Sequence, residues 1–188
     1  MLEHTASLLR ENTGTTGILD TLRRAVEVLA HHDIPHLVVG GIAVQEHGYY
    51  RVTLDVDLVV PDILEAVEFL TADLSGPFVR VPNCETRVRD QRNGVFIDLL
   101  PAGYVLKDGC KVPFPQPGKV SDLPVLATLP DVISLKLDSW AGSPSRRLKD
   151  KADVIELIKA LDLPRDLPVK PATKNLYEET WDALQADQ

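Results

Sequence analysis

The chain has 188 residues, 44% of them hydrophobic, and a formal net charge of −8. This length fits one domain, or one domain with an appendage, and the apolar fraction is enough for a full core, which excludes a disordered chain. Proteins that bind nucleic acid over their whole surface are usually basic, so the acidic balance restricts such binding to a local patch.

The first predicted elements alternate between helix and strand. Residues 1–15 are polar, and we expect them to be flexible. Apolar residues at helical spacing predict an amphipathic helix over 16–32, namely Ile18, Leu22, Val26 and Leu29. The short apolar run at 36–39 predicts a strand, and residues 42–47 predict a short helix.

The alternation of apolar and polar residues is clearest over residues 51–60, and it predicts a strand with one apolar and one polar face. The apolar face holds Val52, Leu54, Val56 and Leu58, and the polar face holds Arg51, Thr53, Asp55 and Asp57. A second amphipathic helix is predicted over 62–72. Strands follow at 84–90 and 94–100, and Asn93-Gly94 between them is typical of a type I′ hairpin turn.

The last third of the chain is predicted to be helical after a surface loop. Four prolines punctuate residues 113–124 and predict the loop. Helices are predicted over 130–141 and 149–161. The chain therefore divides into a main domain, 16–162, and a C-terminal extension, 163–188, with one amphipathic helix that docks on the body or on a partner.

Neither a membrane span nor a secretory signal is expected. No run approaches eighteen apolar residues, and the first residues lack a basic region followed by an apolar one. Two cysteines, Cys84 and Cys110, are too few for a disulfide framework or a paired metal motif. We therefore expect a cytoplasmic protein with two free thiols.

Two carboxylates on one strand face are the first candidate site. Asp55 and Asp57 point the same way, and like charges about 4 Å apart repel by roughly 4 kcal/mol at an effective dielectric near 20. A cation between them would remove that cost, and an all-oxygen ligand set favours Mg²⁺. The alternative is a polar sheet face that meets water.

A third carboxylate strengthens the interpretation of this face as a cation site. Asp98 lies in the apolar segment 95–100, where burying a lone carboxylate is costly. A metal shared with Asp55 and Asp57 explains all three carboxylates at once. The alternative is an ion pair between Asp98 and Arg87 or Arg89.

Other residues extend the candidate site. Gly40-Gly41 lies between a strand and a helix, where backbone without Cβ atoms can approach a phosphate, although a tight turn is the commoner role. Lys136 shares a helix face with apolar residues. Asp150 and Asp153 extend the inward face of the next helix, and for Asp150 the alternative is N-terminal capping of that helix.

These segments resemble a known family. Residues 40–48 and 51–58 together are similar to the signature of the nucleotidyltransferase fold, and more narrowly to AbiEii-type toxins and related minimal nucleotidyltransferases. Residues 133–137 with Arg147, Lys149-Asp150 and 152–154 are similar to that group's second motif. Ile42 stands where many members of the wider fold carry serine.

The resemblance implies an α/β (α+β) fold, with a mixed sheet flanked by helices and C-terminal helices. It implies two Mg²⁺ ions held by Asp55, Asp57 and Asp98, and transfer of a nucleotidyl group from a nucleoside triphosphate (NTP) such as ATP to a hydroxyl. Nucleotide binding is then expected from Gly40, Gly41, Arg51, Thr53, Lys136 and Asp150. In this scheme Lys136 neutralises the triphosphate, Asp98 helps to deprotonate the acceptor, and Asp150 holds Lys136 or the loop near Gly40.

Three functions compete. The first is a toxin that modifies RNA, with tRNA as the leading acceptor and an antitoxin as partner. The second is an enzyme that modifies a small hydroxylated molecule such as an antibiotic, and the third is a non-catalytic binder of nucleotide or a partner protein. Arg87, Arg89 and Arg92 are a candidate basic patch for RNA, and a solvated strand edge is the alternative.

Overall fold

The computed structural model describes residues 13–186. Its elements in chain order are α2 (Thr13–His31), β1 (Leu37–Val38), α3 (Gly40–His47), β2 (Asp55–Val60), α4 (Ile63–Leu70), β3 (Phe78–Val81), β4 (Cys84–Asp90), β5 (Phe96–Pro101), α5 (Leu129–Ala141), α6 (Leu148–Leu161), the 3₁₀ turn η2 (Pro171–Thr173) and α7 (Lys174–Ala186).

The sheet is mixed, and this confirms the α+β class expected from the sequence. Its five strands lie in the order β1-β2-β5-β4-β3. The central pair, β2 and β5, is parallel, and the remaining pairs are antiparallel. The parallel register places Asp57 of β2 opposite Asp98 of β5.

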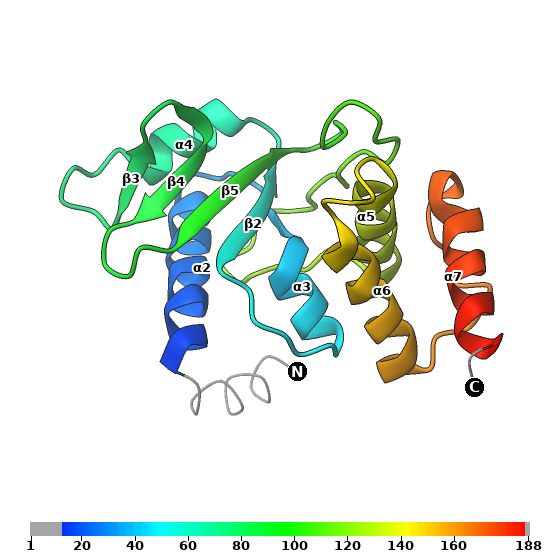
Figure 1. The fold of residues 1–188 in the computed structure, drawn as a ribbon. Coiled ribbons are helices and arrows are strands. Elements are labelled where there is room, and N and C mark those ends of the chain that lie inside the picture. The colour runs from blue at the N-terminus through cyan, green and yellow to red at the C-terminus, as the bar shows by residue number, and fades with distance from the viewer. Residues whose placement is uncertain (1–12, 187–188) are drawn as a thin grey trace.

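Two apolar clusters hold the layers together. In the first, buried side chains of α2 and α4 pack against the sheet, including Val26, Val67 and Ile97. In the second, α3, α5, α6 and α7 pack around residues such as Val44, Leu137 and Leu157. Figure 1 shows α2 and α4 beside the strands and α5, α6 and α7 following one another away from them.

The C-terminal helix docks on the body. Tyr177 of α7 is fully buried in the second cluster, and its hydroxyl donates to the carbonyl of Pro164 at 2.8 Å. Trp181 donates its indole N–H to the carbonyl of Leu163 at 2.9 Å. These contacts fix α7 to the segment that follows α6.

The strand expected over 51–60 is shorter than predicted. β2 begins at Asp55, opposite the first residue of β5, Phe96, so residues 51–54 have no partner in that strand. Val52 and Leu54 are consequently exposed, at 74% and 77%, and do not share a buried face with Val56 and Leu58.

Other boundaries also differ from those predicted. Strand β3, which pairs with β4, was not predicted, because its four residues lie between Pro77 and Pro82 and show no long alternation. Helix α2 already begins at Thr13, within the segment expected to be flexible, and residues 1–12 lie outside the described part of the chain.

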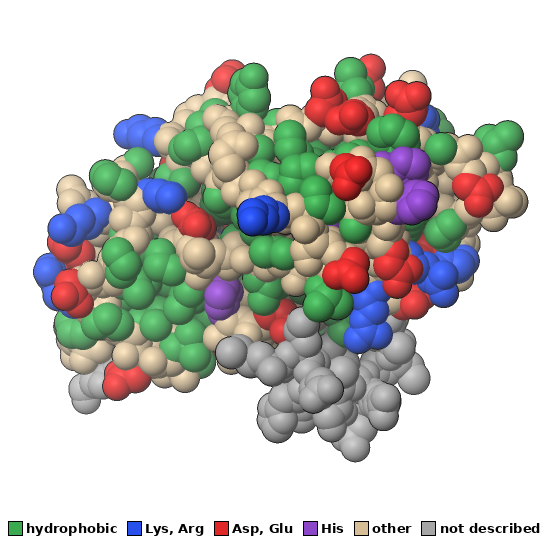
Figure 2. All heavy atoms as spheres, turned by 180° about the vertical axis from the view of Figure 1, so that it is seen from behind, with side chains coloured by type: hydrophobic (Ala, Val, Ile, Leu, Met, Phe, Trp, Pro, Cys, Tyr) green, Lys and Arg blue, Asp and Glu red, His purple; other side chains and the backbone are tan. Residues whose placement is uncertain are grey.

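The surface mixes charged and apolar side chains. Figure 2 shows the molecule from behind, where acidic, basic and apolar groups are interspersed and the coloured residues form no continuous basic area. Cys84 and Cys110 are both free thiols. Between residues 13 and 186, no helix has the length and apolar composition needed to cross a membrane.

We predict that Tyr177→Ala destabilises the protein by about 3–5 kcal/mol, because it removes a fully buried ring and leaves a cavity. Urea unfolding followed by circular dichroism measures the change. Tyr104→Ala, at an exposed tyrosine, is the matched control and is expected to change stability by about 0.5 kcal/mol or less. Equal losses in the two variants would contradict a structural role for α7.

Candidate active site

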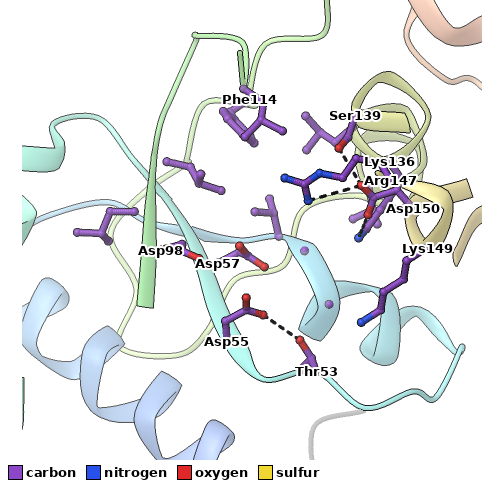
Figure 3. A pocket seen from close by; sticks show the side chains of 18 of the residues that line it. Thr53, Asp55, Asp57, Asp98, Phe114, Lys136, Ser139, Arg147, Lys149 and Asp150 are labelled. Carbon is purple, nitrogen blue, oxygen red and sulfur yellow. Dashed lines mark hydrogen bonds and ion pairs between the residues drawn. The ribbon is translucent and has the colours of Figure 1, made fainter. Parts of the chain in front are cut away.

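A pocket of about 420 Å³ opens between the sheet and the helices α3, α5 and α6. The nine candidate residues named from the sequence all line it: Gly40, Gly41, Arg51, Thr53, Asp55, Asp57, Asp98, Lys136 and Asp150. Figure 3 shows the aspartates of β2 and β5 on one side and the side chains of α5 and α6 on the other. Segments far apart in sequence therefore meet at one cavity.

The sheet side of the pocket is a carboxylate wall. Asp55 and Asp57 project from alternate positions of β2, while Val56 and Leu58 between and after them are buried in the core. The hydroxyl of Thr53 donates to Asp55 Oδ1 at 3.3 Å. The alternation of β2 therefore turns the carboxylates away from the core and into the pocket.

Asp57 is the most strongly perturbed of these groups. Burial, followed by the charges of Asp55 and Asp98, raises the pKa of Asp57 from 3.8 to about 6, against the opposing effects of Lys136 and the backbone N–H of Gly41. A carboxyl group that resists ionisation among other carboxylates is a favourable position for a cation.

The glycine pair leaves no room for side chains. A Cβ on Gly40 would lie 1.8 Å from Asp57 Oδ2, and Gly40 has a φ of +65°. A Cβ on Gly41 would lie 2.3 Å from Thr53 Oγ1. The start of α3 thus packs its backbone directly against the carboxylate wall, which only glycine permits. Ile42, at the position of the serine of the wider fold, is buried in the core.

Asp98 is held by an arginine. Arg87 of the neighbouring strand β4 contacts both carboxylate oxygens of Asp98, through Nε and through Nη2, the latter at 2.7 Å from Oδ2. The ion pair weighed as the alternative for Asp98 is therefore present. Its two side chains are partly exposed, at 38% and 20%, so solvent weakens the attraction between their charges.

The donor chemistry of the wall fits a hard cation only in part. Asp55 and Asp57 supply oxygen ligands, and their mutual repulsion favours a cation. Asp98 lies beside them in register but points its oxygens at Arg87. Within residues 13–186, no three acidic, His or Cys side chains converge as a ready metal site. Asp98 can therefore join the other two only by sharing its oxygens with Arg87 or by leaving it.

A buried ion-pair network forms the helical wall. Lys136 Nζ lies 2.7 Å from Asp150 Oδ1 and 2.9 Å from Asp153 Oδ2. Ser139 donates to Asp150 at 2.7 Å, and Arg51 donates to Asp153 at 2.9 Å. This network connects the segment before β2 to α5 and α6. The contact of Asp150 with Lys136 agrees with the expectation that Asp150 holds this lysine.

Two partners in this network were not assigned from the sequence. Ser139 gives no signal, because a serine in a helix is usually unremarkable. The inward position of Asp153 was visible in the spacing of α6, but its partner Arg51 lies 102 residues away and only the fold brings them together.

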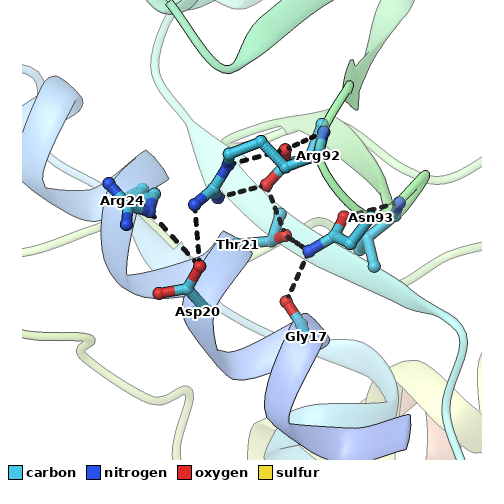
Figure 4. A network of polar contacts seen from close by, with 8 residues as sticks. Gly17, Asp20, Thr21, Arg24, Arg92 and Asn93 are labelled. Atoms are coloured by element: carbon cyan, nitrogen blue, oxygen red, sulfur yellow. Dashed lines mark hydrogen bonds and ion pairs between the residues drawn. The ribbon is translucent and has the colours of Figure 1, made fainter.

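The turn before β5 is not the predicted type I′ hairpin. Gly94 has a positive φ, but Asn93 does not, and this turn type requires it at both residues. Asn93 instead donates from Nδ2 to the carbonyl of Gly17 and to the hydroxyl of Thr21, each at 2.9 Å (Figure 4). These contacts attach the turn to α2 in place of the tighter geometry.

The three arginines proposed as a basic patch, Arg87, Arg89 and Arg92, all contact other side chains of the protein. Arg87 pairs with Asp98, and Arg92 pairs with Asp90 and Asp20 (Figure 4). Arg89 lies over the ring of Phe96, 5.9 Å from its centroid. Two of the three charges are neutralised within the chain, which favours the alternative of a solvated strand edge.

Comparison with known proteins supports the fold. The sequence matches no family model and no curated protein. Among solved structures, the chain is similar to the solution structure of the antibiotic-resistance factor ANT(2'')-Ia, with a TM-score of 0.54 and 14% identity over 93% of this chain and 96% of that chain. At this identity the likeness concerns the fold alone, and it agrees with the expected nucleotidyltransferase fold. The AbiEii-type subgroup stays a prediction.

We predict that Asp57→Asn stabilises the metal-free protein at pH 7, by on the order of 1 kcal/mol. The folded state keeps the Asp57 proton up to about pH 6, whereas the ordinary pKa is 3.8. Raising the pH between these values therefore favours the unfolded wild-type chain.

Thermal melts from pH 3.5 to 8, with a chelator present, measure this effect. The advantage of the variant should grow from pH 4 to pH 6 and then level off. Asp122→Asn, at an exposed carboxylate, is the control and should show no such rise. A variant that is less stable than wild type throughout would contradict charge crowding at Asp57.

We also predict that Lys136→Met destabilises the protein by about 2–4 kcal/mol, because it leaves two buried carboxylates without their shared cation. Lys159→Met removes an exposed lysine paired with Glu156 and is expected to cost about 0.5 kcal/mol or less. Chemical denaturation of both variants provides the test. A small loss for Lys136→Met would show that the network does not support the fold.

Proposed function

We propose that this protein is a magnesium-dependent nucleotidyltransferase that moves a nucleotidyl group from an NTP to a hydroxyl. One observation carries the proposal: Asp55 and Asp57 crowd together on one wall of a pocket, directly against a glycine pair that no side chain can replace. Such an arrangement is costly for stability alone and suits a cation with its phosphate ligand.

The proposed roles follow from the positions of the side chains. Asp55, Asp57 and Asp98, which shares its oxygens with Arg87 or leaves it, are the proposed magnesium ligands. When bound, magnesium neutralises phosphate charge and aligns the attacking and leaving oxygens, and the resemblance implies two ions. The bond from the α-phosphorus to the bridging oxygen breaks, and pyrophosphate leaves with the electron pair. The acceptor oxygen bonds to the α-phosphorus and gives its proton to a base, for which we propose Asp98.

The remaining candidates shape the nucleotide site. Gly40 and Gly41 let the backbone of α3 approach a phosphate, and Thr53 orients Asp55. Arg51, Lys136 and Asp150 belong to the network that holds α5 and α6 against the sheet. The charge of Lys136 also reaches Asp57, where it opposes the rise in pKa.

A small hydroxylated molecule is the acceptor that the observations favour. The pocket volume lies within the range of small-molecule sites. Arg87 and Arg92 are already paired with carboxylates, and the net charge is −8, so little positive surface remains for a long polyanion. The similarity to an antibiotic-resistance factor supports the same choice.

The other functions stay predictions from the sequence. An RNA acceptor such as tRNA, a toxin role, an antitoxin partner and a cytoplasmic location rest on the resemblance and on composition. A non-catalytic binder of nucleotide is the third possibility, and an experiment on transfer separates all three.

The test follows label from each α-³²P-labelled NTP in the presence of magnesium. One set of reactions contains a panel of hydroxylated antibiotics including aminoglycosides, and the other contains total cellular RNA. We expect label on a small molecule. The double variant Asp55→Asn/Asp57→Asn should reduce transfer by more than about a hundredfold, because losing the metal ligands themselves costs more activity than losing the residues that support such ligands.

Each outcome assigns a function. Label in RNA that disappears in the double variant would move the acceptor from a small molecule to RNA. Tight NTP binding without transfer to either set would favour the non-catalytic binder. Transfer that persists in the double variant would contradict the proposed site.

A further inference from the structure

The helical wall of the pocket carries more positive charge than its carboxylates neutralise. Lys136, Arg147 and Lys149 line the pocket on this side, and Arg51 reaches the same network from the segment before β2. Within the described residues, the carboxylates that form ion pairs with these cations are Asp150 and Asp153. The two surplus charges can be located from the contacts.

Lys136 and Arg51 are not the surplus cations. Lys136 lies within 3 Å of both carboxylates and is only 13% exposed, and Arg51 contacts Asp153 through two nitrogens. Moving Lys136 onto a phosphate would take the shared cation away from two buried carboxylates, leaving Asp150 with Ser139 and Asp153 with Arg51, which is costly. The lysine that the family resemblance assigns to the triphosphate is thus already engaged in holding the wall.

Arg147 and Lys149 are the surplus cations. The nearest carboxylate oxygen to Arg147 is 3.9 Å away, on Asp150, whose two oxygens already accept from Lys136 and Ser139. Arg147 is half-exposed, Lys149 is exposed, and within residues 13–186 no hydrogen bond or ion pair joins Lys149 to another residue. Figure 3 shows both side chains extending from the start of α6 toward the pocket.

We propose that Arg147 and Lys149, rather than Lys136, bind the terminal phosphates of the NTP. This inference rests on the proposed function. A guanidinium matches two phosphate oxygens at once, and an ammonium contributes a mobile point charge. The carboxylate wall repels phosphates that carry no metal, so the β- and γ-phosphates turn to the helical wall, with the α-phosphate beside Asp55 and Asp57. The two cations then select triphosphates over monophosphates.

The test compares nucleotides of one base that differ only in phosphate number. Calorimetry with magnesium first finds the NTP that wild type binds best, and then measures its Kd together with that of the matching monophosphate. Arg147→Gln/Lys149→Gln should weaken NTP binding by about a hundredfold, from two lost charge-assisted contacts, and monophosphate binding by about twofold or less.

The matched control is Arg146→Gln/Lys159→Gln. This variant also removes one arginine and one lysine charge, at Arg146 before α6 and at Lys159 near the end of α6. Neither residue lines the pocket. We expect this variant to bind NTP within about threefold of wild type, the residual effect of distant charges at ordinary salt. Melting temperatures confirm that both variants are folded.

Three results would overturn the inference. If the pocket variant keeps wild-type NTP affinity, or loses no more than the control, then Arg147 and Lys149 do not bind the phosphates, and the proposed function is untouched. If NTP and monophosphate binding fall equally, the two residues act on the nucleoside or on the fold. If wild type binds no NTP with magnesium, the proposed function falls together with this inference.

Discussion

The parallel pairing of β2 with β5 is the constraint on which the rest of the pocket depends. It brings Asp55, Asp57 and Asp98 to one wall, and three carboxylates in that position need positive partners. The chain supplies several: Arg87 contacts Asp98 directly, and Lys136 acts on Asp57 through its charge and Gly41 through its N–H. Burial, more than the charges of Asp55 and Asp98, raises the pKa of Asp57, and the positive partners do not offset the two effects together. A cation bound at the proposed site would relieve the repulsion that remains between these carboxylates.

The close approach of the α3 backbone to the carboxylate wall connects the sheet to the helices on the other side of the pocket. Glycines at the start of α3 let that helix contact β2, and Arg51 bridges from the segment before β2 to Asp153 in α6. The apolar cluster that contains α3, α5 and α6 lies behind these contacts. The position of the carboxylates is therefore linked to that of the cations across the pocket, because the buried ion pair between Arg51 and Asp153 joins the two walls.

Much of this arrangement is predictable from sequence because it is local. The alternation of β2 shows that Asp55 and Asp57 share a face, and helical spacing shows that Asp150 and Asp153 point inward. The pairing of Asp98 with Arg87 was one of the alternatives open from the sequence, and the register of β4 and β5 selects it. The partner of Arg51 is not predictable, because only the packing of the layers brings Asp153 to it across 102 residues. Residues 51–54 show a related limit: their pattern suits a strand, but a strand forms only where a neighbour exists to receive its hydrogen bonds. The predicted type I′ turn at Asn93 is wrong for a similar reason, because the contacts of Asn93 with α2 outweigh the local turn preference.

The attachment of α7 has a mechanical consequence for the opposite end of α6. Tyr177 and Trp181 bind the segment just after α6, whereas Arg147 and Lys149 stand at its beginning. A helix of 14 residues is a rod about 20 Å long, so its two ends tilt together. We therefore expect the C-terminal helix to act as a remote anchor for the pocket: with α7 loosened, only the packing of α6 and the buried contacts of Asp150 and Asp153 would still hold the helix that presents Arg147 and Lys149.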